Sequence, residues 1–285
     1  MDGSKSVFAI LAFGELGESS RISLDSILKI HDSTICVAGH SLGLTWVRKN
    51  LSASQTRQLC THQIPEKDLF ELNLLPTRYS TYSNFGQERF IKLTTFKWFL
   101  ISDILQRHPN LDYVIFSDLD VLWLKTPEIG IFNSTEYASC LAIIQNDTPR
   151  GNPTTYFCTG IMFWKNCLES SSVLNSLFVD QMQSNVSGSL IPDEPIFNQW
   201  FQKRKNQSLV KALPSNQFVI GHRFFHLILS INFDLQKINA FHSNYVVGEK
   251  AKAQRLQAII HRQSKNIRWL PAFFKILIQK LFSLN

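Results

Sequence analysis

The sequence predicts an α/β protein, and three observations support this. Short apolar runs typical of buried strands start near the N-terminus and alternate with segments of helical periodicity. The chain has 285 residues, 44% of them hydrophobic, which is enough for a substantial core in one large domain or two small ones. No internal repeat or low-complexity tract interrupts the alternation. Strands that alternate with helices pack as a sheet between layers of helices.

The N-terminal elements are predicted from short stretches. Val7–Ala12 is predicted to be a buried first strand, followed by a loop over the residues FGELGESS. Ser33–Ala38 is a second short strand candidate. The segment from about Thr56 to Gln87 is rich in Pro, Ser, Thr and Asn with weak periodicity, which predicts loop and short turns.

The clearest helix prediction covers Glu88–Arg107. Pro109 lies just past its end, and its apolar residues fall on one stripe at helical spacing: Phe90, Leu93, Leu100, Ile101 and Ile104. Lys97 lies in the middle of this stripe. Its ammonium could reach solvent at the rim, or it could point into a site shaped for anions, and the stripe alone leaves both open.

Three more elements follow. Val114–Phe116 is predicted to be a strand that ends at a pair of aspartates, and Cys158–Trp164 is predicted to be another strand. A helix is predicted over Asp193–Phe201, directly after Pro192.

Asp118 and Asp120 form the first candidate site. Ligands of open α/β sheets bind outside the carboxyl ends of strands, which is where these two acids stand. Alternation in an extended chain puts both carboxylates on one side, so both can reach one cation. Mg²⁺ and Mn²⁺ favour oxygen ligands and usually share them with phosphates. The alternative is that the acids merely begin a turn.

A second enzyme class also uses D-x-D after a strand, namely phosphatases of the haloacid dehalogenase type. Those enzymes need Gly-Thr or a close variant after the second aspartate, usually near the N-terminus. Here Val121 and Leu122 follow the pair at mid-chain, which disfavours that class.

Three segments downstream of the aspartates carry a family resemblance. They are YFCTGIMFWKN (156–166), DEPIFNQWF (193–201) and FHSNYVVGEKAKAQRL (241–256). Together with the D-x-D strand they resemble nucleotide-diphospho-sugar transferases of the GT-A fold, in the families of glycogenin, bacterial lipopolysaccharide galactosyltransferases and plant cell-wall xylosyl- and arabinosyltransferases. The resemblance covers roughly residues 85–256 and implies a Rossmann-like α/β/α sandwich with a mixed, mainly parallel sheet.

Two positions depart from the family pattern. Cys158 stands where the families often have Asn, and Glu194 replaces the usual Gln after Asp193. The Thr159-Gly160 pair is retained, as is Asn198. If the departures have cost the chain its catalysis, it would be a membrane-associated module that only binds nucleotide-sugars.

The resemblance implies a metal site. Asp118 would contact the donor ribose and the metal, Asp120 would ligate the metal, and His242 would complete the protein's share. A divalent cation, Mn²⁺ or Mg²⁺, would stabilise the diphosphate leaving group of a nucleotide-sugar, with a UDP-sugar expected. The alternative for His242 is a buried, hydrogen-bonded histidine without a metal.

The resemblance also implies contacts with the diphosphate. Lys250 or Lys252 could pair with it as a point charge, and Gly248 would let the backbone approach the phosphates. Solvated lysines beside a basic tail are the alternative. Lys97 would face the nucleotide, because the families commonly carry a basic residue on this helix.

The transferring sugar would be held near the start of the helix that Asp193 begins. Asp193 is the candidate for binding its hydroxyls, and Glu194 would lie close to the anomeric carbon. An N-terminal helix cap is the alternative for Asp193. Gly160 is interpreted as a position where a side chain would collide with the donor. The resemblance favours transfer with retention.

The charge of the chain is concentrated in its tail. Eight basic and no acidic residues follow Glu249, so the first 249 residues carry 29 − 8 = 21 basic and 22 acidic groups. A nucleic-acid binder would carry its charge on the folded body, which disfavours that class. We expect a glycosyltransferase domain over residues 1–250 and a basic amphipathic extension over residues 251–285.

Residues 266–285 combine aromatic and aliphatic side chains with three basic residues. This composition fits a helix that lies in the interface of an anionic membrane, and bacterial lipopolysaccharide galactosyltransferases have a similar tail. A glycan or lipid-linked envelope acceptor follows as a hypothesis. A terminal helix packed on the body or on a second copy is the alternative.

The remaining features concern the compartment. The five cysteines are odd in number and lack CxxC spacing, which argues against a disulfide framework and a structural zinc site. The run VFAILAF is interpreted as a strand and not a signal peptide. No run approaches the roughly 18 apolar residues that a membrane span needs. We expect a cytoplasmic protein, peripheral on the inner face of a membrane.

Overall fold

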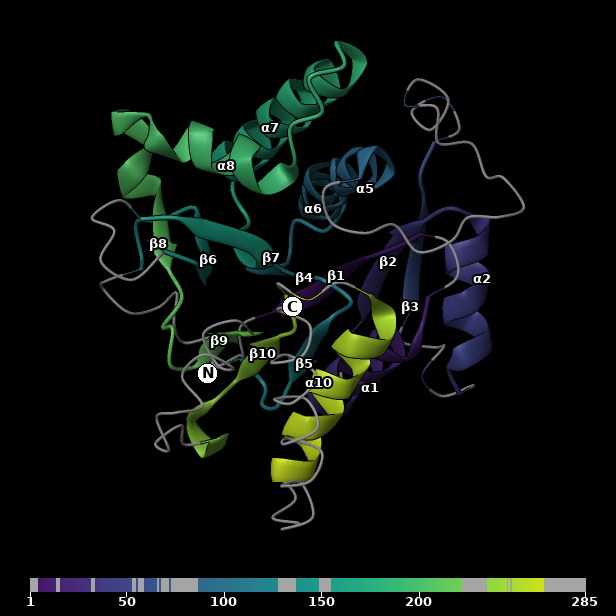
Figure 1. Cartoon of the computed structure of the whole chain (residues 1–285). Coiled ribbons are helices and arrows are strands. Elements are labelled where there is room, and N and C mark those ends of the chain that lie inside the picture. The colour runs from purple at the N-terminus through teal and green to yellow at the C-terminus, as the bar shows by residue number, and fades with distance from the viewer. Residues whose placement is uncertain are drawn as a thin grey trace, which may run out of the picture.

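A computed structural model describes most of the residues between 5 and 263 (Figure 1). The described residues are 5–13, 16–31, 34–52, 55, 59–65, 67, 72, 87–127, 137–148, 155–221, 235–244, 246 and 248–263. The strands are β1 Ser6–Ala12, β2 Ile35–Gly39, β3 Leu59–Gln63, β4 Tyr113–Ser117, β5 Val121–Trp123, β6 Ala142–Asn146, β7 Phe157–Lys165, β8 Val210–Ala212, β9 Phe218–Ile220 and β10 Ala240–His242. The α-helices are α1 Glu18–Ile30, α2 Ser41–Asn50, α5 Glu88–Thr94, α6 Phe96–Arg107, α7 Leu168–Val186, α8 Asp193–Gln202 and α10 Glu249–Gln263. Short 3₁₀ helices cover Arg204–Leu209 and Leu235–Lys237.

The main sheet has seven strands in the order β3-β2-β1-β4-β7-β6-β8. The pairs β3-β2, β2-β1, β1-β4 and β6-β8 are parallel, and β7 runs antiparallel to both of its neighbours. The predicted mixed, mainly parallel sheet of an α/β sandwich is therefore confirmed.

A second, three-stranded sheet has the order β5-β10-β9. β5 starts directly after the aspartate pair, and β10 pairs with it so that His242 lies opposite Val121. The small sheet therefore brings the start of the segment 241–256 next to the end of β4, although more than a hundred residues separate them in sequence.

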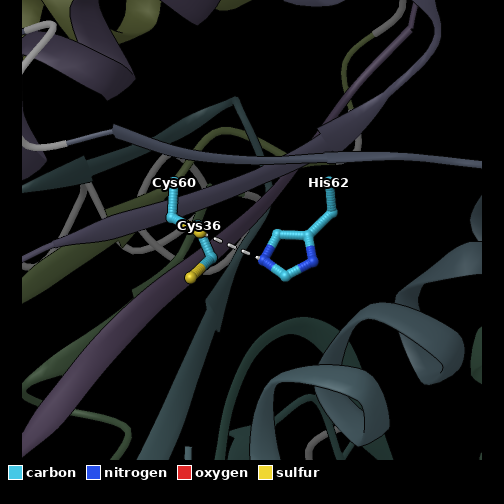
Figure 2. A group of neighbouring side chains, drawn as sticks. All are labelled: Cys36, Cys60 and His62. Carbon is cyan, nitrogen blue, oxygen red and sulfur yellow. Dashed lines mark hydrogen bonds between the residues drawn. The ribbon is translucent and has the colours of Figure 1, made fainter. Parts of the chain in front are cut away.

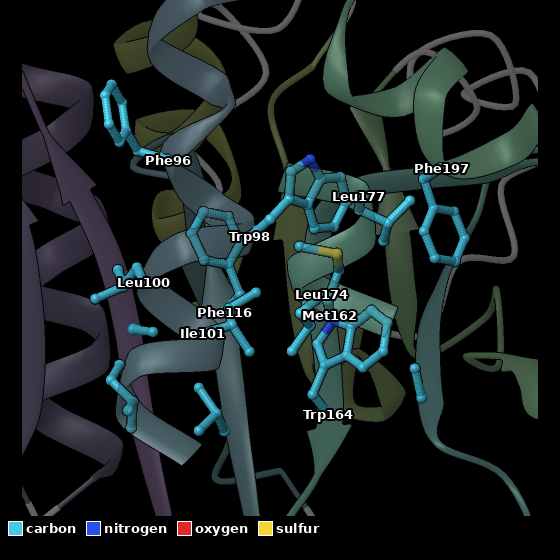
Figure 3. Packing of buried hydrophobic residues seen from close by; sticks show 14 of the residues in the cluster. Phe96, Trp98, Leu100, Ile101, Phe116, Met162, Trp164, Leu174, Leu177 and Phe197 are labelled. Carbon is cyan, nitrogen blue, oxygen red and sulfur yellow. The ribbon is translucent and has the colours of Figure 1, made fainter. Parts of the chain in front are cut away.

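The main sheet separates two apolar clusters, because each buried strand alternates its side chains between the faces. In β4, Val114 and Phe116 belong to one cluster, while Tyr113 and Ile115 belong to the other. The first cluster is closed by α6, α7 and α8, as Figure 3 shows around Trp98, Trp164 and Phe197. The second is closed by α1 and α2. The chain thus forms three layers with the sheet in the middle (Figure 1).

The helix predicted over Glu88–Arg107 is two helices, α5 and α6, that meet at Thr95. The hydroxyl of Thr94 donates to the carbonyl of Ile91 at 2.9 Å, and that of Thr95 reaches the same oxygen at 3.4 Å. Threonine hydroxyls that bond back to the preceding turn bend helices. Asn185 on α7 also donates to the Thr95 hydroxyl at 2.8 Å, which holds the junction against the neighbouring helix.

Two loop predictions are wrong in part. The loop over residues 13–20 ends earlier, because α1 begins at Glu18. The segment Thr56–Gln87 contains the strand β3, which pairs with β2 along its whole length. The pairing partner supplies the order that the local sequence of β3 does not predict, since strand formation depends on context more than on composition.

α10 crosses the predicted domain boundary at residue 250 and packs against α1. Its Leu256 and Ile259 are buried in a third apolar cluster, together with Phe241 of β10. The division at residue 250 itself stays a prediction. The predicted amphipathic tail, residues 266–285, lies outside the described residues. Among the described helices, none is both long and apolar enough to cross a bilayer.

Candidate metal and anion site

Asp118, Asp120 and His242 meet at the carboxyl end of β4. One ligand atom of each lies within 4.8 Å of those of the other two. The aspartates lie in a turn after β4 and not in a strand, and the turn is held on both sides. The N–H of Asp118 donates to the carbonyl of Gly160 at 2.8 Å, and the N–H of Ser243 donates to the carbonyl of Asp120 at 2.9 Å. The backbone thus positions both carboxylates, as the sequence predicted, but by a turn and not by strand alternation.

The imidazole of His242 is buried between two oxygen atoms. Its Nδ1 lies 2.8 Å from Oε1 of Gln145, and its Nε2 lies 3.1 Å from a carboxylate oxygen of Asp120. A carbonyl oxygen only accepts, so Nδ1 carries the proton and donates to Gln145. In the neutral ring Nε2 then presents its lone pair to a carboxylate, an arrangement that a cation between the two atoms stabilises. Two carboxylates and this imidazole therefore fit a divalent cation.

Gln145 was not predicted as a site residue. It is fully buried on β6, where the register between β6 and β7 shifts between Ile144 and Gln145. Such irregularities re-aim side chains next to functional sites. A polar residue at the end of the apolar run Leu141–Ile144 is the sequence signal that could have found it.

Gly160 lies in the part of β7 that this register shift leaves unpaired with β6. A Cβ on Gly160 would lie 2.1 Å from Cε1 of His242, so the imidazole fills the space that a side chain would need. This contact with the histidine is a structural reason for the glycine, and the predicted contact of this position with the donor stays a prediction. Gly160 allows the close approach of β7 to His242.

Lys97 is buried and points into the site instead of reaching the rim. Its ammonium lies 3.0 Å from a carboxylate oxygen of Asp118 and 2.8 Å from Oδ2 of Asp193, with 4% of its side chain exposed. Burial lowers the pKa of Lys97, but the two carboxylates outweigh it and raise the pKa above its usual range. The ammonium therefore stays charged and links the metal-ligand candidates to the start of α8.

Asp193 is the first residue of α8, and its side chain points to β7 and α6. Oδ2 accepts a hydrogen bond from the hydroxyl of Thr159 at 2.5 Å, besides the contact with Lys97. Burial acts to raise the pKa of Asp193, yet Lys97 and the hydroxyl donors hold it below its usual range. Pro192 occupies the N-cap, so the carboxylate of Asp193 does not cap α8.

Of the two lysine candidates on α10, Lys252 contacts an aspartate. Its ammonium lies 2.6 Å from Oδ2 of Asp120. Burial would raise the pKa of Asp120, but the ammonium of Lys252 holds it far below its usual range. Lys250 is exposed on α10. Gly248 has a φ of +94°, a backbone conformation that favours glycine, just before α10 begins.

Glu194 lies beside three polar groups that were not predicted to contact it. Burial, Asp193 and Asp147 raise the pKa of Glu194 to about 7. It accepts a hydrogen bond from Tyr156, whose own pKa is raised by burial and by Glu194. The thiol of Cys158 also bonds to Glu194 and lies 3.7 Å from Nδ1 of His242. Both departures from the family pattern are thus in contact with each other.

The raised pKa of Glu194 predicts a pH-dependent stability. Because the folded pKa of about 7 exceeds the ordinary value of 4.5, the native state holds a proton that the unfolded state loses between these values. Stability therefore falls as the pH rises from about 4.5 through 7. In Glu194→Gln this contribution is absent. The difference in unfolding free energy between the variant and the unchanged protein should therefore shift in favour of the variant between pH 5 and pH 7.5. Urea unfolding of both proteins at several pH values measures the difference; parallel pH curves would contradict it.

The comparisons with known proteins agree with this geometry. A family model for nucleotide-diphospho-sugar transferases matches residues 54–256, well over half of the chain. The chain therefore belongs to the nucleotide-diphospho-sugar transferase family, and its site lies within the matched range. A search of curated protein sequences found no match.

Solved structures show the same fold at low sequence identity. The galactosyltransferase LgtC, in complex with donor and acceptor sugar analogues, superposes with a TM-score of 0.55 and 12% identity over 88% of this chain and 95% of LgtC. Mouse xyloside xylosyltransferase 1 gives 0.51 and 13% over 84% of this chain and 98% of its own. GlyE of Streptococcus pneumoniae gives 0.53 and 13% over 98% of this chain, which spans 64% of GlyE. The fold is that of GT-A glycosyltransferases.

Proposed function

We propose that this protein is a metal-dependent glycosyltransferase that moves a sugar from a nucleotide-diphospho-sugar, a UDP-sugar in our reading, to a glycan or lipid-linked acceptor. One observation carries the proposal: two carboxylates and an imidazole lie within 4.8 Å of one another at the carboxyl end of β4. In a nucleotide-diphospho-sugar transferase this is where a cation and a diphosphate would be held. Retention at the anomeric carbon remains part of the proposal on family resemblance alone.

Asp118, Asp120 and His242 would hold the cation, Mn²⁺ or Mg²⁺. The cation would neutralise the negative charge that grows on the diphosphate as the bond to the anomeric carbon breaks. Gln145 would orient His242 by accepting the proton of Nδ1, which leaves Nε2 as the ligand atom. Gly160 would act indirectly, by leaving room for the imidazole.

Two lysines would supply the remaining positive charge. Lys252 is held on Asp120 and is 19% exposed, so its ammonium can turn from the carboxylate to a diphosphate when one is bound. Lys97 is buried and paired twice, and would hold the carboxylates of Asp118 and Asp193 in place. We favour Lys252 over the exposed Lys250 as the diphosphate contact, and Gly248 as the turn that starts its helix.

Asp193 and Glu194 would bind the transferring sugar. The carboxylate of Asp193, fixed by Lys97 and Thr159, would accept hydrogen bonds from sugar hydroxyls. Glu194, with a pKa of about 7, can donate or accept a proton near neutral pH, which suits a group close to the anomeric carbon.

A donor screen tests the proposed function. Nucleotide-sugars that differ in base and in sugar are added to the purified protein with Mn²⁺, with Mg²⁺ or with a chelator, and the melting temperature is followed. A donor that binds only the folded state at a hundred times its Kd stabilises by about 2.7 kcal/mol, so one UDP-sugar should raise the melting temperature only with the cation. Slow release of free sugar in the same samples separates a transferase from a module that binds without turnover. If no nucleotide-sugar shifts the melting temperature, the proposal fails.

The choice of acceptor also belongs to the proposal, and we assign it to two segments of the sequence. The segments in which the sequence would encode it, Thr56–Gln87 and Phe224–Asn239, lie largely outside the described residues. The tail, residues 266–285, also lies outside the described residues. The peripheral location on an anionic, cytoplasmic membrane face therefore stays a prediction, and so does the boundary between a domain over residues 1–250 and the extension that follows it.

Deletion of residues 266–285 tests the membrane prediction. The deletion removes three basic residues and all four aromatic residues (Phe and Trp) after Glu249, while α10 stays intact. We expect co-sedimentation with anionic liposomes to fall to the level seen with neutral liposomes, with donor binding unchanged. The matched control replaces only the three basic residues, Arg268, Lys275 and Lys280, by Gln. Undiminished binding of the truncated protein to anionic liposomes would rule out the tail as the anchor.

A further inference from the structure

A second cluster of metal-ligating side chains lies on β2 and the edge strand β3 of the main sheet. Cys36 on β2 and Cys60 on β3 are direct partners in the parallel register of these strands. His62 follows Cys60 by two residues, so alternation puts it on the same face of the sheet. Figure 2 shows the two thiols and the imidazole gathered on this side of the two strands.

The spacing of the ligand atoms fits a tetrahedral ion with sulfur and nitrogen ligands. The two sulfur atoms and one ring nitrogen of His62 all lie within 4.8 Å of one another. Sγ of Cys60 lies 3.4 Å from Nε2 of His62. Zn–S bonds of about 2.3 Å and Zn–N bonds of about 2.0–2.1 Å at tetrahedral angles separate the ligand atoms by about 3.5–3.8 Å. Small side-chain rotations therefore suffice.

The imidazole of His62 is oriented for ligation by a residue from a different element. Its Nδ1 lies 2.9 Å from a carboxylate oxygen of Asp103 on α6, and only 7% of the His62 side chain is exposed. When Nδ1 donates to this carboxylate, Nε2 is left with its lone pair facing the thiols. Zinc-bound histidines are almost always held in this way by a second partner, which fixes the tautomer and raises the basicity of the ligand atom.

We infer that Cys36, Cys60 and His62 form a site for Zn²⁺, with Asp103 as the positioning residue for His62. The site is distinct from the oxygen-rich one at Asp118 and Asp120, because thiolate and imidazole ligands select Zn²⁺ while carboxylates select Mg²⁺ and Mn²⁺. Binding releases the two thiol protons to solvent. Three protein ligands leave the fourth position to water or to a further ligand.

The site would tie the edge strand β3 to the rest of the fold. β3 lies at the end of the sheet, and only β2 pairs with it among the described strands. The ion would join β3 to β2 through the thiols, and to α6 through His62 and Asp103. α6 also carries Lys97, so the zinc site would stabilise the helix whose lysine pairs with Asp118 and Asp193.

The sequence did not predict this cluster, because its two cysteines lack CxxC spacing. Its two cysteines come from different strands, and their distance in space follows from the register of β2 with β3. The expectation of no structural zinc site rested on sequence spacing alone, and the strand register supplies what that spacing lacks.

Titration with Co²⁺ tests the inference, because Co²⁺ occupies zinc sites and absorbs strongly when thiolates bind it. The full chain is stripped with a chelator under reducing conditions and then titrated. We expect a thiolate-to-cobalt charge-transfer band that saturates at one ion per chain and disappears when Zn²⁺ is added. Cys36→Ser and Cys60→Ser should lose most of the band. Asp103→Asn should keep the band but bind the ion roughly 10–100-fold more weakly.

Two cysteine variants serve as controls. Cys167→Ser changes a thiol at the start of α7, and Cys158→Ser changes the thiol 3.7 Å from His242; both should retain the band. A band lost in Cys158→Ser would place the ion at the other site and overturn the inference. So would the lack of any band, or a band that survives in Cys36→Ser and Cys60→Ser. If the serine variants do not fold, the affinity loss in Asp103→Asn decides alone.

Discussion

Asp120→Asn should abolish donor turnover and its dependence on a divalent cation. The amide keeps the shape of the side chain but removes the charge that faces both Lys252 and His242. Charge stabilisation by a catalytic cation is worth several kcal/mol, and each 1.4 kcal/mol is about tenfold in rate. We therefore expect release of sugar from the donor to fall by a factor of about 1,000 or more, with no response to Mn²⁺.

The variant should remain folded, because the partner ammonium of Lys252 is 19% exposed and can be solvated. Circular dichroism and the melting temperature without donor check this point. Asp180→Asn is the matched control, since Asp180 is an exposed aspartate on α7. It should leave both turnover and cation dependence unchanged. Full turnover in Asp120→Asn would refute the metal assignment while leaving the family membership intact.

The parts of the fold that could be predicted from the sequence are those with strong local patterns. β1 and β4 are apolar except for one serine each, and β7 carries the apolar run Ile161–Trp164; the structure places all three strands in the middle of the sheet, buried on both faces. α8 begins at Asp193 as predicted, directly after Pro192. Such elements can be recognised without tertiary information, because strands buried on both faces are apolar along most of their length.

Helices with buried polar residues escaped prediction. α1 buries Ser19, Ser20, Ser23 and Ser26, so its inward stripe is not apolar in sequence. α7 buries Gln181, whose Oε1 accepts a hydrogen bond from the indole of Trp98 at 2.7 Å. A polar residue that is satisfied by a distant partner looks like a surface residue until the partner is known. These helices therefore required tertiary information.

The candidate site shows the same division. The D-x-D pair and Asp193 could be found from strand and helix ends, and the family resemblance added His242 and the choice between Lys250 and Lys252. Gln145 and the contact between Gly160 and the imidazole depend on the register shift of β6 against β7, which no short sequence pattern encodes. Lys97 was ambiguous in sequence because a lysine on an apolar stripe is compatible with either orientation; the contacts of its ammonium with Asp118 and with the buried Asp193 decide it.

Lys97→Met should be the most destabilising single substitution at the site. Methionine has a similar length and fills the apolar space over Phe116, whose ring centroid lies 5.2 Å from the ammonium. What is lost is the charge that neutralises Asp118 and Asp193. Removing one partner of a buried ion pair typically costs about 3–5 kcal/mol, because the remaining charge stays buried without compensation. Urea unfolding at pH 7 should show a loss of this size.

The pH dependence and a second substitution identify the cause of the loss. Lys97 holds the pKa of Asp193 below its usual range, so without the ammonium burial raises that pKa. A carboxyl group with a raised folded pKa destabilises more as the pH rises, and the deficit of Lys97→Met should therefore shrink as the pH falls from 7 towards 4. Asp193→Asn in the same chain removes the charge left without a partner, so the double variant should be more stable than the sum of the single losses predicts.

Lys92→Met is the control: Lys92 on α5 pairs with Glu88, which is 62% exposed, and such surface pairs contribute about 0–1 kcal/mol. Equal losses in Lys92→Met and Lys97→Met, or strict additivity with Asp193→Asn, would show that the buried charge of Lys97 is not what holds the start of α8 against β7.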